Sequence, residues 1–204
     1  MLVVADDLSG AVEVAAVLGA KRIALGHADG DVVDLDTRAL PPDEAARRIR
    51  ALDGRITFKK IDSLLRGNVQ AELEALSGEL IVTPALPVEG RTVRNGVLHV
   101  HGVPQATPIG VLDAETDEDL DAIVAAAPPH ATLVGSAGLA AALGRRLGVT
   151  PLPRPTPRDV PLLVGVGTRA ADEQVKRLRG VEVNRARPMK SRGGSPPHRV
   201  PTSC

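Results

Sequence analysis

Short apolar runs alternate with amphipathic segments along the first part of this chain. Five runs have the length and aliphatic content typical of buried strands: 2–5, 22–25, 32–35, 55–58 and 80–83. Three intervening segments have the periodicity or the capping residues of helices: 11–18, 41–51 and about 68–76. Such alternation favours a mostly parallel sheet with helices on both faces. The pattern therefore predicts an α/β, Rossmann-like fold.

The next region adds a small insertion to this pattern. Residues 84–102 are rich in Gly and Pro and contain an alternating run at 97–101, which predicts a hairpin. His99 and His101 would share one face of its strand, either as a metal pair or on an exposed face. We favour the exposed face, because no third ligand is near in sequence. The remaining expected elements are a strand at 109–112, a helix at 116–127, a strand ending at 133–134 and a helix at 136–147.

A composition shift near residue 150 indicates a domain boundary. Residues 1–150 are expected to form one domain, and the five prolines of 151–161 predict an extended linker. A strand at 162–166 and a helix at 170–178 would begin a second domain within 162–183. Residues 184–204 are mostly Arg, Pro, Ser and Gly, so we expect a disordered tail.

The densest polar segment follows the strand that ends at residue 58 and precedes the helix near residue 68. Five of its residues carry charge or a hydroxyl: Lys59, Lys60, Asp62, Ser63 and Arg66. Ligands bind at the carboxyl edge of open α/β sheets, so these groups are expected to face a ligand. The cations suit a carboxylate or phosphate, and Asp62 suits a hydroxyl proton. The alternative is a solvated, charged turn.

Two other segments carry candidate chemistry. Asp6 and Asp7 follow the first strand, where paired carboxylates can coordinate a cation, bind hydroxyls or act as a general base. The equal alternative is that Asp7 and Ser9 cap the next helix. In the loop after residue 84, Arg91 either clamps a carboxylate through its two-pronged guanidinium or is an ordinary surface arginine.

Two glycine-rich turns give weaker signals. The segment 135–139, Gly-Ser-Ala-Gly-Leu, permits either anion binding at a helix start or tight packing of helix on sheet. The segment 165–169, Gly-Val-Gly-Thr-Arg, follows a predicted strand and is typical of a nucleotide phosphate loop, although short glycine turns are common.

Composition narrows the class of partner. Lys+Arg and Asp+Glu both number 25, so no net field attracts nucleic acid or an anionic membrane. Phe58 is the only aromatic residue, which argues against base stacking. Cys204 is the only cysteine, which excludes an internal disulfide and a multi-cysteine zinc site. The apolar start stops at Asp6, so the sequence predicts a cytoplasmic protein rather than a secreted one.

Five motifs in a fixed order resemble those of the four-carbon acid sugar kinases. They read ADDLSGA at 5–11, KIDSLLRG at 60–67, PALPVEGRT at 84–92, DAETDEDL at 113–120 and GSAGL at 135–139. The resemblance implies an ATP-dependent kinase of threonate-like or erythronate-like sugar acids, with Mg²⁺. It also implies two α/β domains, of which the N-terminal one binds the sugar acid and the C-terminal one binds ATP.

The resemblance also implies roles for individual residues. Seven positions would line the substrate pocket: Asp6, Asp7, Lys60, Asp62, Ser63, Arg66 and Arg91. Either Asp7 or Asp62 would act as the catalytic base, and Gly167 and Thr168 would contact ATP. The partners implied are a small sugar acid and either a second copy of the chain or a separate nucleotide-binding domain.

This chain departs from the family pattern in two places. The connection at 105–112 is shorter than is common in the family, and the later ATP-binding motifs do not follow the second domain's first strand and helix. We therefore expect a truncated or frameshifted kinase that holds the sugar acid without turnover. The alternatives are a non-catalytic sugar-acid-binding module and, at a lower rank, a receiver-type signalling domain with Asp36 or Asp62 as phosphoacceptor.

Overall fold

The computed structural model describes residues 1–26, 30–52 and 56–153. Met1–Pro155 form one compact unit. The expectations for most of the linker, the start of a second domain, Gly167, Thr168 and the tail lie outside the described residues.

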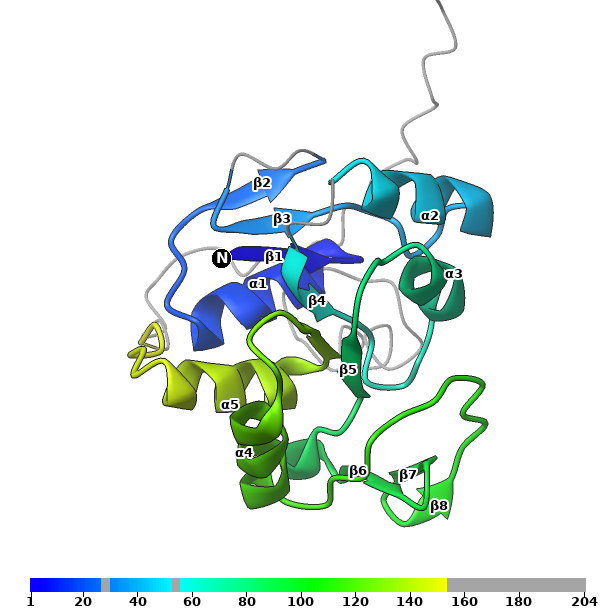
Figure 1. Cartoon of the computed structure of the whole chain (residues 1–204), viewed down its shortest axis with the longest axis vertical. Helices are drawn as coiled ribbons and strands as arrows, with labels where there is room; N and C mark the ends of the chain where they lie inside the picture. The colour runs from blue at the N-terminus through cyan, green and yellow to red at the C-terminus, as the bar shows by residue number, and fades with distance from the viewer. Residues whose placement is uncertain (27–29, 53–55, 154–204) are drawn as a thin grey trace, which may run out of the picture. The chain divides into compact units, whose positions relative to one another are not determined.

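A six-stranded sheet forms the centre of this unit (Figure 1). Its strands are β1 (Leu2–Ala5), β2 (Ile23–Leu25), β3 (Val32–Asp34), β4 (Ile56–Lys60), β5 (Leu80–Thr83) and β9 (Thr132–Gly135). Their order is β2-β3-β1-β4-β9-β5, and these neighbours all pair in parallel. Consequently the carboxyl ends of the six strands lie at one edge.

Helices cover both faces of the sheet, as Figure 1 shows. They are α1 (Leu8–Val17), α2 (Pro42–Arg50), α3 (Val69–Glu74), α4 (Asp117–Ala126) and α5 (Ala137–Arg146), with a 3₁₀ turn at η1 (Pro87–Glu89). Successive strand residues point to opposite faces, so Val3 packs with α1 and α5 whereas Val4 packs with α2. The predicted α/β fold is confirmed.

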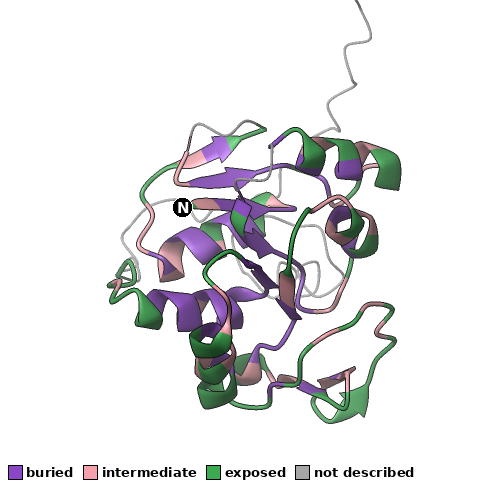
Figure 2. Ribbon diagram, in the orientation of Figure 1, coloured by how far each residue is buried: buried purple, intermediate pink, exposed green. Residues whose placement is uncertain are grey.

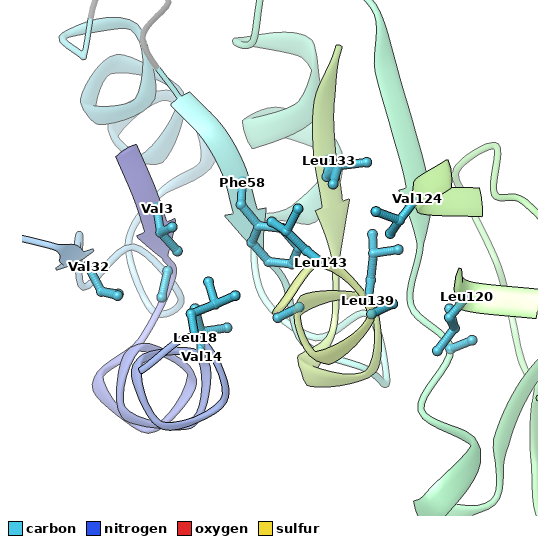
Figure 3. Packing of buried hydrophobic residues seen from close by; sticks show 14 of the residues in the cluster. Val3, Val14, Leu18, Val32, Phe58, Leu120, Val124, Leu133, Leu139 and Leu143 are labelled. Atoms are coloured by element: carbon cyan, nitrogen blue, oxygen red, sulfur yellow. The ribbon is translucent and has the colours of Figure 1, made fainter. Parts of the chain in front are cut away.

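The larger core lies between the sheet and α1, α4 and α5. Phe58 is completely buried there with Val3, Val14, Leu133 and Leu143 (Figure 3). Figure 2 shows that the central strands are buried along most of their length, while the outward helix faces are exposed. Buried apolar runs of this kind are typical of parallel strands covered on both sides.

The hairpin insertion is present as a separate antiparallel sheet. It consists of β6 (Arg91–Arg94), β7 (Val97–Val100) and β8 (Val103–Pro104). Asn95 and Gly96 form its first turn with positive φ angles of 50° and 72°, as a two-residue hairpin turn requires.

Two local predictions in this region are wrong. His101 lies beyond β7 with a φ of 48°, so it does not share a strand face with His99. Residues 109–112 form no strand, although the Leu112 N–H donates to the Val82 carbonyl at the edge of β5. Pro108 and Gly110 explain the second error, because proline removes a ladder donor and glycine weakens a strand.

Candidate functional site

The candidate site lies at the carboxyl ends of three adjacent strands. β3, β1 and β4 are neighbours in the sheet, and each is followed by a charged segment. Asp6 and Asp7 follow β1, Arg38 lies in the loop after β3, and Asp62 follows β4. Parallel pairing therefore brings together residues that are distant in the sequence, at the edge where ligands bind in open α/β sheets.

Arg38 joins the carboxylates of this edge. Its Nε and Nη2 donate to the two carboxylate oxygens of Asp6 at 2.8 and 3.1 Å. Its Nη1 donates to Asp7 Oδ2 at 2.6 Å, and Nη2 lies 3.7 Å from Asp62 Oδ1. One guanidinium thus contacts three of the predicted substrate-binding residues, although the sequence analysis did not select Arg38.

Gly67 allows this arrangement by leaving room beside Arg38. Its φ is +84°, and a Cβ there would lie 3.0 Å from Arg38 Cγ. A side chain at position 67 would therefore strain the backbone and also push Arg38 away from the carboxylates.

Asp7 has both of the roles that the sequence left open. Its Oδ1 accepts the Gly10 N–H at 2.8 Å, which caps α1, while Oδ2 binds Arg38. Ser9 is exposed inside α1 and is not the cap, so that part of the capping alternative is wrong. A Cβ on Gly10 would lie 2.8 Å from Asp7 Oδ1 and 3.2 Å from Lys60 Nζ, so this glycine lets α1 approach the site side chains.

Lys59 and Lys60 are not part of a solvated turn. Both belong to β4 and are buried, which overturns the expectation that the strand ends at Phe58. Lys60 Nζ lies 3.2 Å from Glu13 Oε2 and donates to the Ile61 carbonyl at 3.2 Å. The buried ammonium groups are thus compensated by carboxylates and carbonyls, as burial of charge requires.

Asp62 is held by Arg66 within the turn after β4. Arg66 Nε and Nη2 donate to its two oxygens at 2.8 and 2.7 Å, and the N–H groups of Leu64 and Arg66 also donate to Oδ2. Burial alone would raise the pKa of Asp62, but the hydrogen bonds and charge of Arg66, with the charge of Arg38, lower it to about 2. Asp62 is therefore ionised at neutral pH.

Replacing Arg66 with glutamine is expected to raise the pKa of Asp62. The folded-state pKa of Asp62 is lower than the unfolded value of about 3.9, so ionised Asp62 stabilises the fold above roughly pH 4. This contribution is lost as the pH falls toward 2, and in Arg66→Gln it should be lost at higher pH. A carboxyl-detected NMR titration of Asp62 measures the change directly.

Arg146→Gln is the matched control, because Arg146 is exposed at the end of α5. It should leave the Asp62 titration unchanged. The role assigned to Arg66 would be contradicted by an Asp62 carboxyl that titrates at the same pH in Arg66→Gln and in the parent chain.

Asp34 is a further acidic group that sequence reasoning missed. It ends β3, is buried, and accepts the Asp36 N–H at 2.8 Å. Burial is the largest effect and raises the pKa of Asp34. The hydrogen bond from the Asp36 N–H lowers the pKa, and the negative charges of Asp36, Asp7 and Asp6 raise it further. Ionised Asp34 therefore costs stability in the folded chain.

We expect Asp34→Asn to stabilise the protein at neutral pH by about 0.5–1 kcal/mol, a size typical of relieved charge repulsion. Because the pKa of Asp34 is raised on folding, the parent chain loses stability as the pH rises through the folded-state value. The extra stability of Asp34→Asn should therefore disappear at acidic pH, where Asp34 of the parent chain is mostly protonated in the folded and in the unfolded state. Urea unfolding at pH 7 and pH 3.5 compares the two conditions, and an equal gain at both would contradict the prediction.

Ser63 and Arg91 are also brought together. Arg91 Nη1 donates to Ser63 Oγ, and Arg91 Nη2 lies 2.8 Å from Glu89 Oε2. The link joins the turn after β4 to the start of the hairpin insertion, which agrees with a shared site and not with an isolated surface arginine.

The Gly135–Leu139 turn supports the packing alternative. Ser136 Oγ accepts the Gly138 N–H at 3.1 Å and donates to the Ala85 carbonyl at 2.5 Å. A Cβ on Gly138 would lie 2.7 Å from that carbonyl oxygen, so glycine permits α5 to pack against the loop after β5. Its small residues therefore have a structural explanation that involves no ligand.

Within 1–26, 30–52 and 56–153, no three His, Cys, Asp or Glu side chains are placed to hold a metal ion. The carboxylates at the sheet edge contact guanidinium groups instead. A metal ion at the described residues would have to rely on fewer than three protein side chains of these kinds, as Mg²⁺ commonly does together with waters and substrate phosphates.

Over the same residues, no helix has the length and apolar character needed to cross a membrane.

Comparison with known proteins identifies a matching family model and several related enzymes. Residues 1–109 match a family model described as a sugar-binding N-terminal domain. The chain is 40% identical over 157 residues to a D-threonate kinase of Cupriavidus necator, covering 65% of this chain and 38% of that enzyme. It is 34% identical to a D-threonate kinase of Bordetella bronchiseptica, covering 96% of this chain and 53% of that enzyme.

A crystal structure from Bordetella bronchiseptica has the same fold. This domain of unknown function, a domain-swapped dimer with bound citrate, superposes with a TM-score of 0.58 at 27% identity and covers 71% of this chain and 56% of that one. Other relatives of the chain are named D-erythronate kinase and 3-oxo-tetronate kinase. The chain therefore belongs to the four-carbon acid sugar kinase family, and its residues 1–109 match the family's sugar-binding N-terminal domain.

Proposed function

We propose that this chain binds a four-carbon sugar acid, such as a threonate or an erythronate, at the carboxyl edge of β3, β1 and β4. One observation carries the proposal: Arg38 is held at this edge by Asp6, Asp7 and Asp62, in a sugar-binding domain of this family. The edge thus carries positive and negative side chains next to one another.

The two kinds of charge suit the two ends of a sugar acid. Guanidinium and ammonium groups bind a carboxylate, and carboxylates accept hydrogen bonds from hydroxyls. Four cations in or next to the segments at this edge are candidates for the carboxylate: Arg38, Lys60, Arg66 and Arg91. Asp7 is the carboxylate that a ligand hydroxyl can reach, because its side chain is 21% exposed whereas that of Asp6 is 2% exposed and bound at both oxygens by Arg38. The citrate held by the related Bordetella structure is also a small hydroxy acid, which supports a ligand of this class.

Asp7 is the better candidate for the catalytic base. Both Asp62 oxygens accept hydrogen bonds from Arg66, and with a pKa of about 2 Asp62 has little affinity for a proton. The Asp7 side chain is 21% exposed, whereas that of Asp62 is 7% exposed. Oδ2 of Asp7, which it shares with Arg38 Nη1, would take the hydroxyl proton, while Oδ1 caps α1.

We further propose that ATP binds elsewhere than in the described residues, with Gly167 and Thr168 as candidate contacts. The chain spans 38% and 53% of the two D-threonate kinases. Phosphoryl transfer needs both the acceptor and a positioned nucleotide, so this chain alone should bind without turnover. A partner copy of the chain or a separate nucleotide-binding domain, in the cytoplasm, would supply the ATP-binding half of the active site. The dimeric Bordetella structure supports self-association.

A kinase assay tests this proposal. The purified 204-residue chain is incubated with ATP, Mg²⁺ and either D-threonate or D-erythronate, and ADP release is followed, with the Cupriavidus necator D-threonate kinase as positive control. We expect ADP release at the background rate. Sustained release that depends on the sugar acid would show that the chain is a complete kinase.

The second candidate function is a sugar-acid-binding module that has no catalytic role. It shares the binding site and differs only in the fate of the ligand. ADP release that appears when a separately produced nucleotide-binding domain is added would reject the module and support the acceptor half of a kinase. The receiver-type alternative has no support in the site, because both Asp62 oxygens are taken by Arg66 and the family is a sugar-binding one.

A further inference from the structure

A buried ion pair lies directly behind the candidate site. Lys59 of β4 is 0% exposed and Glu72 of α3 is 1% exposed, and Lys59 Nζ lies 3.0 Å from Glu72 Oε2. Lys59 was expected to face a ligand but is buried against Glu72 instead, Glu72 was not selected from the sequence, and the proposed ligand contacts use neither residue. Pairs this deeply buried seldom stabilise a fold more than an apolar pair of the same size, so their presence calls for another explanation.

The Glu72 carboxylate also reaches the loop that carries Arg38. Thr37, which is completely buried, donates its hydroxyl hydrogen bond to Glu72 Oε1. The Thr37 N–H donates to the Asp6 carbonyl at 2.9 Å, and the Thr37 carbonyl accepts from Asn68 Nδ2 at 2.8 Å. The residue before Arg38 is therefore fixed through its side chain, its N–H and its carbonyl.

The same network extends to the other site segments. Lys59 Nζ donates to the carbonyl of Lys60 at 3.0 Å. Asn68 precedes α3 and donates a second hydrogen bond to the Leu40 carbonyl at 2.8 Å, and its own carbonyl accepts the Glu72 N–H at 2.9 Å. One buried carboxylate thus joins β4, α3 and the loop after β3.

We propose that the Lys59–Glu72–Thr37 network positions Arg38 for ligand binding. Arg38 holds its place only if the loop after β3 stays fixed relative to Asp6, and Glu72 is the charged group that ties this loop to β4 and α3. Thr37, Glu72 and Lys59 are positioning residues, because they act through Arg38. The effect on sugar-acid affinity rests on the proposed function, whereas the effect on Arg38 does not.

The sharpest test compares Thr37→Val with Thr37→Ser in the full 204-residue chain. Valine keeps the shape of threonine but removes the hydroxyl, and serine restores it. The first readout is the NMR cross-peak of the Arg38 Nε–H, which Asp6 holds at 2.8 Å. We expect this cross-peak to broaden or shift in Thr37→Val and to remain at the parent position in Thr37→Ser.

The second readout is the dissociation constant for D-threonate and D-erythronate. We expect Thr37→Val to weaken binding by roughly tenfold or more, the size typical when groups that orient ligand-binding side chains are lost. Thr37→Ser should bind like the parent chain. If the parent chain binds neither sugar acid, the proposed function fails, and the Arg38 cross-peak alone then decides the positioning role.

A second variant covers the case in which Thr37→Val does not fold. Lys59→Met combined with Glu72→Leu replaces the ion pair by apolar side chains of similar size, a change that usually preserves folding. We expect a folded protein in which the Arg38 cross-peak has moved. An unchanged Arg38 cross-peak in this double variant or in Thr37→Val would overturn the inference.

Discussion

Replacing Arg38 with alanine is expected to abolish sugar-acid binding and to reduce the free energy of unfolding by about 2–4 kcal/mol. Asp6 would lose both hydrogen bonds of the guanidinium, and its side chain is only 2% exposed, so the carboxylate could not be hydrated instead. Asp7 and Asp62 would lose the same cation. Arg38 is 25% exposed, which places the expected cost below that of a completely buried pair.

Urea unfolding and calorimetric titration with D-threonate measure the two effects. Arg38→Lys is the informative companion, because a single ammonium cannot reproduce the two-pronged contact with Asp6. Arg22→Ala is the control: Arg22 is 69% exposed in its pair with Asp31, so it should cost at most about 1 kcal/mol. An Arg38→Ala protein as stable as Arg22→Ala would contradict the central place of Arg38.

Replacing Phe58 with alanine is expected to cost about 3–5 kcal/mol of stability. Phe58 is the only aromatic residue in the chain and is completely buried between β1, β9 and the α1/α5 layer. The cluster around it consists of aliphatic side chains attached to several strands and helices, among them β1, β9, α1 and α5 (Figure 3), so they cannot readily collapse into the space. Phe58 is also two residues before Lys60, so a loosened β4 would disturb the site.

Far-UV circular dichroism in urea measures the loss, since the chain has no Trp or Tyr to report by fluorescence. Phe58→Leu is the matched control and should cost less, about 1–1.5 kcal/mol, because it keeps most of the apolar volume. The account of the core would be wrong if alanine and leucine at position 58 had the same small effect.

The fold was predictable from sequence because its signals are local. Buried aliphatic runs mark β1 to β5, and the Thr116 side chain caps α4 as its position before three acidic residues indicates. The strand predicted at 109–112 is absent, because an apolar run of four residues does not show whether a neighbouring strand is available to pair with it. The burial of Lys59 and Lys60 in β4 was not predicted, because charged residues usually indicate a turn. Their burial depends on the carboxylates of Glu72 and Glu13, which belong to other elements.

The candidate site was predictable only in part. The rule that ligands bind at the carboxyl ends of strands selected Asp6, Asp7 and Asp62. The same rule applied to the strand at 32–35 would have selected Asp34 and Arg38, which lie directly at and after its end. The partner of Arg38, however, cannot be read from any local signal. Arg38 binds the carboxylates that follow β1 and not its own neighbour Asp36, because the strand order is β3-β1-β4.

Isothermal titration of the 204-residue chain with four-carbon sugar acids, without ATP, tests the central claim most directly. We predict saturable binding of D-threonate or D-erythronate to one site per chain, and no binding to Arg38→Ala. The claim would be contradicted if neither sugar acid produced saturable heat at concentrations well above ~1 mM, the upper end of typical substrate affinities.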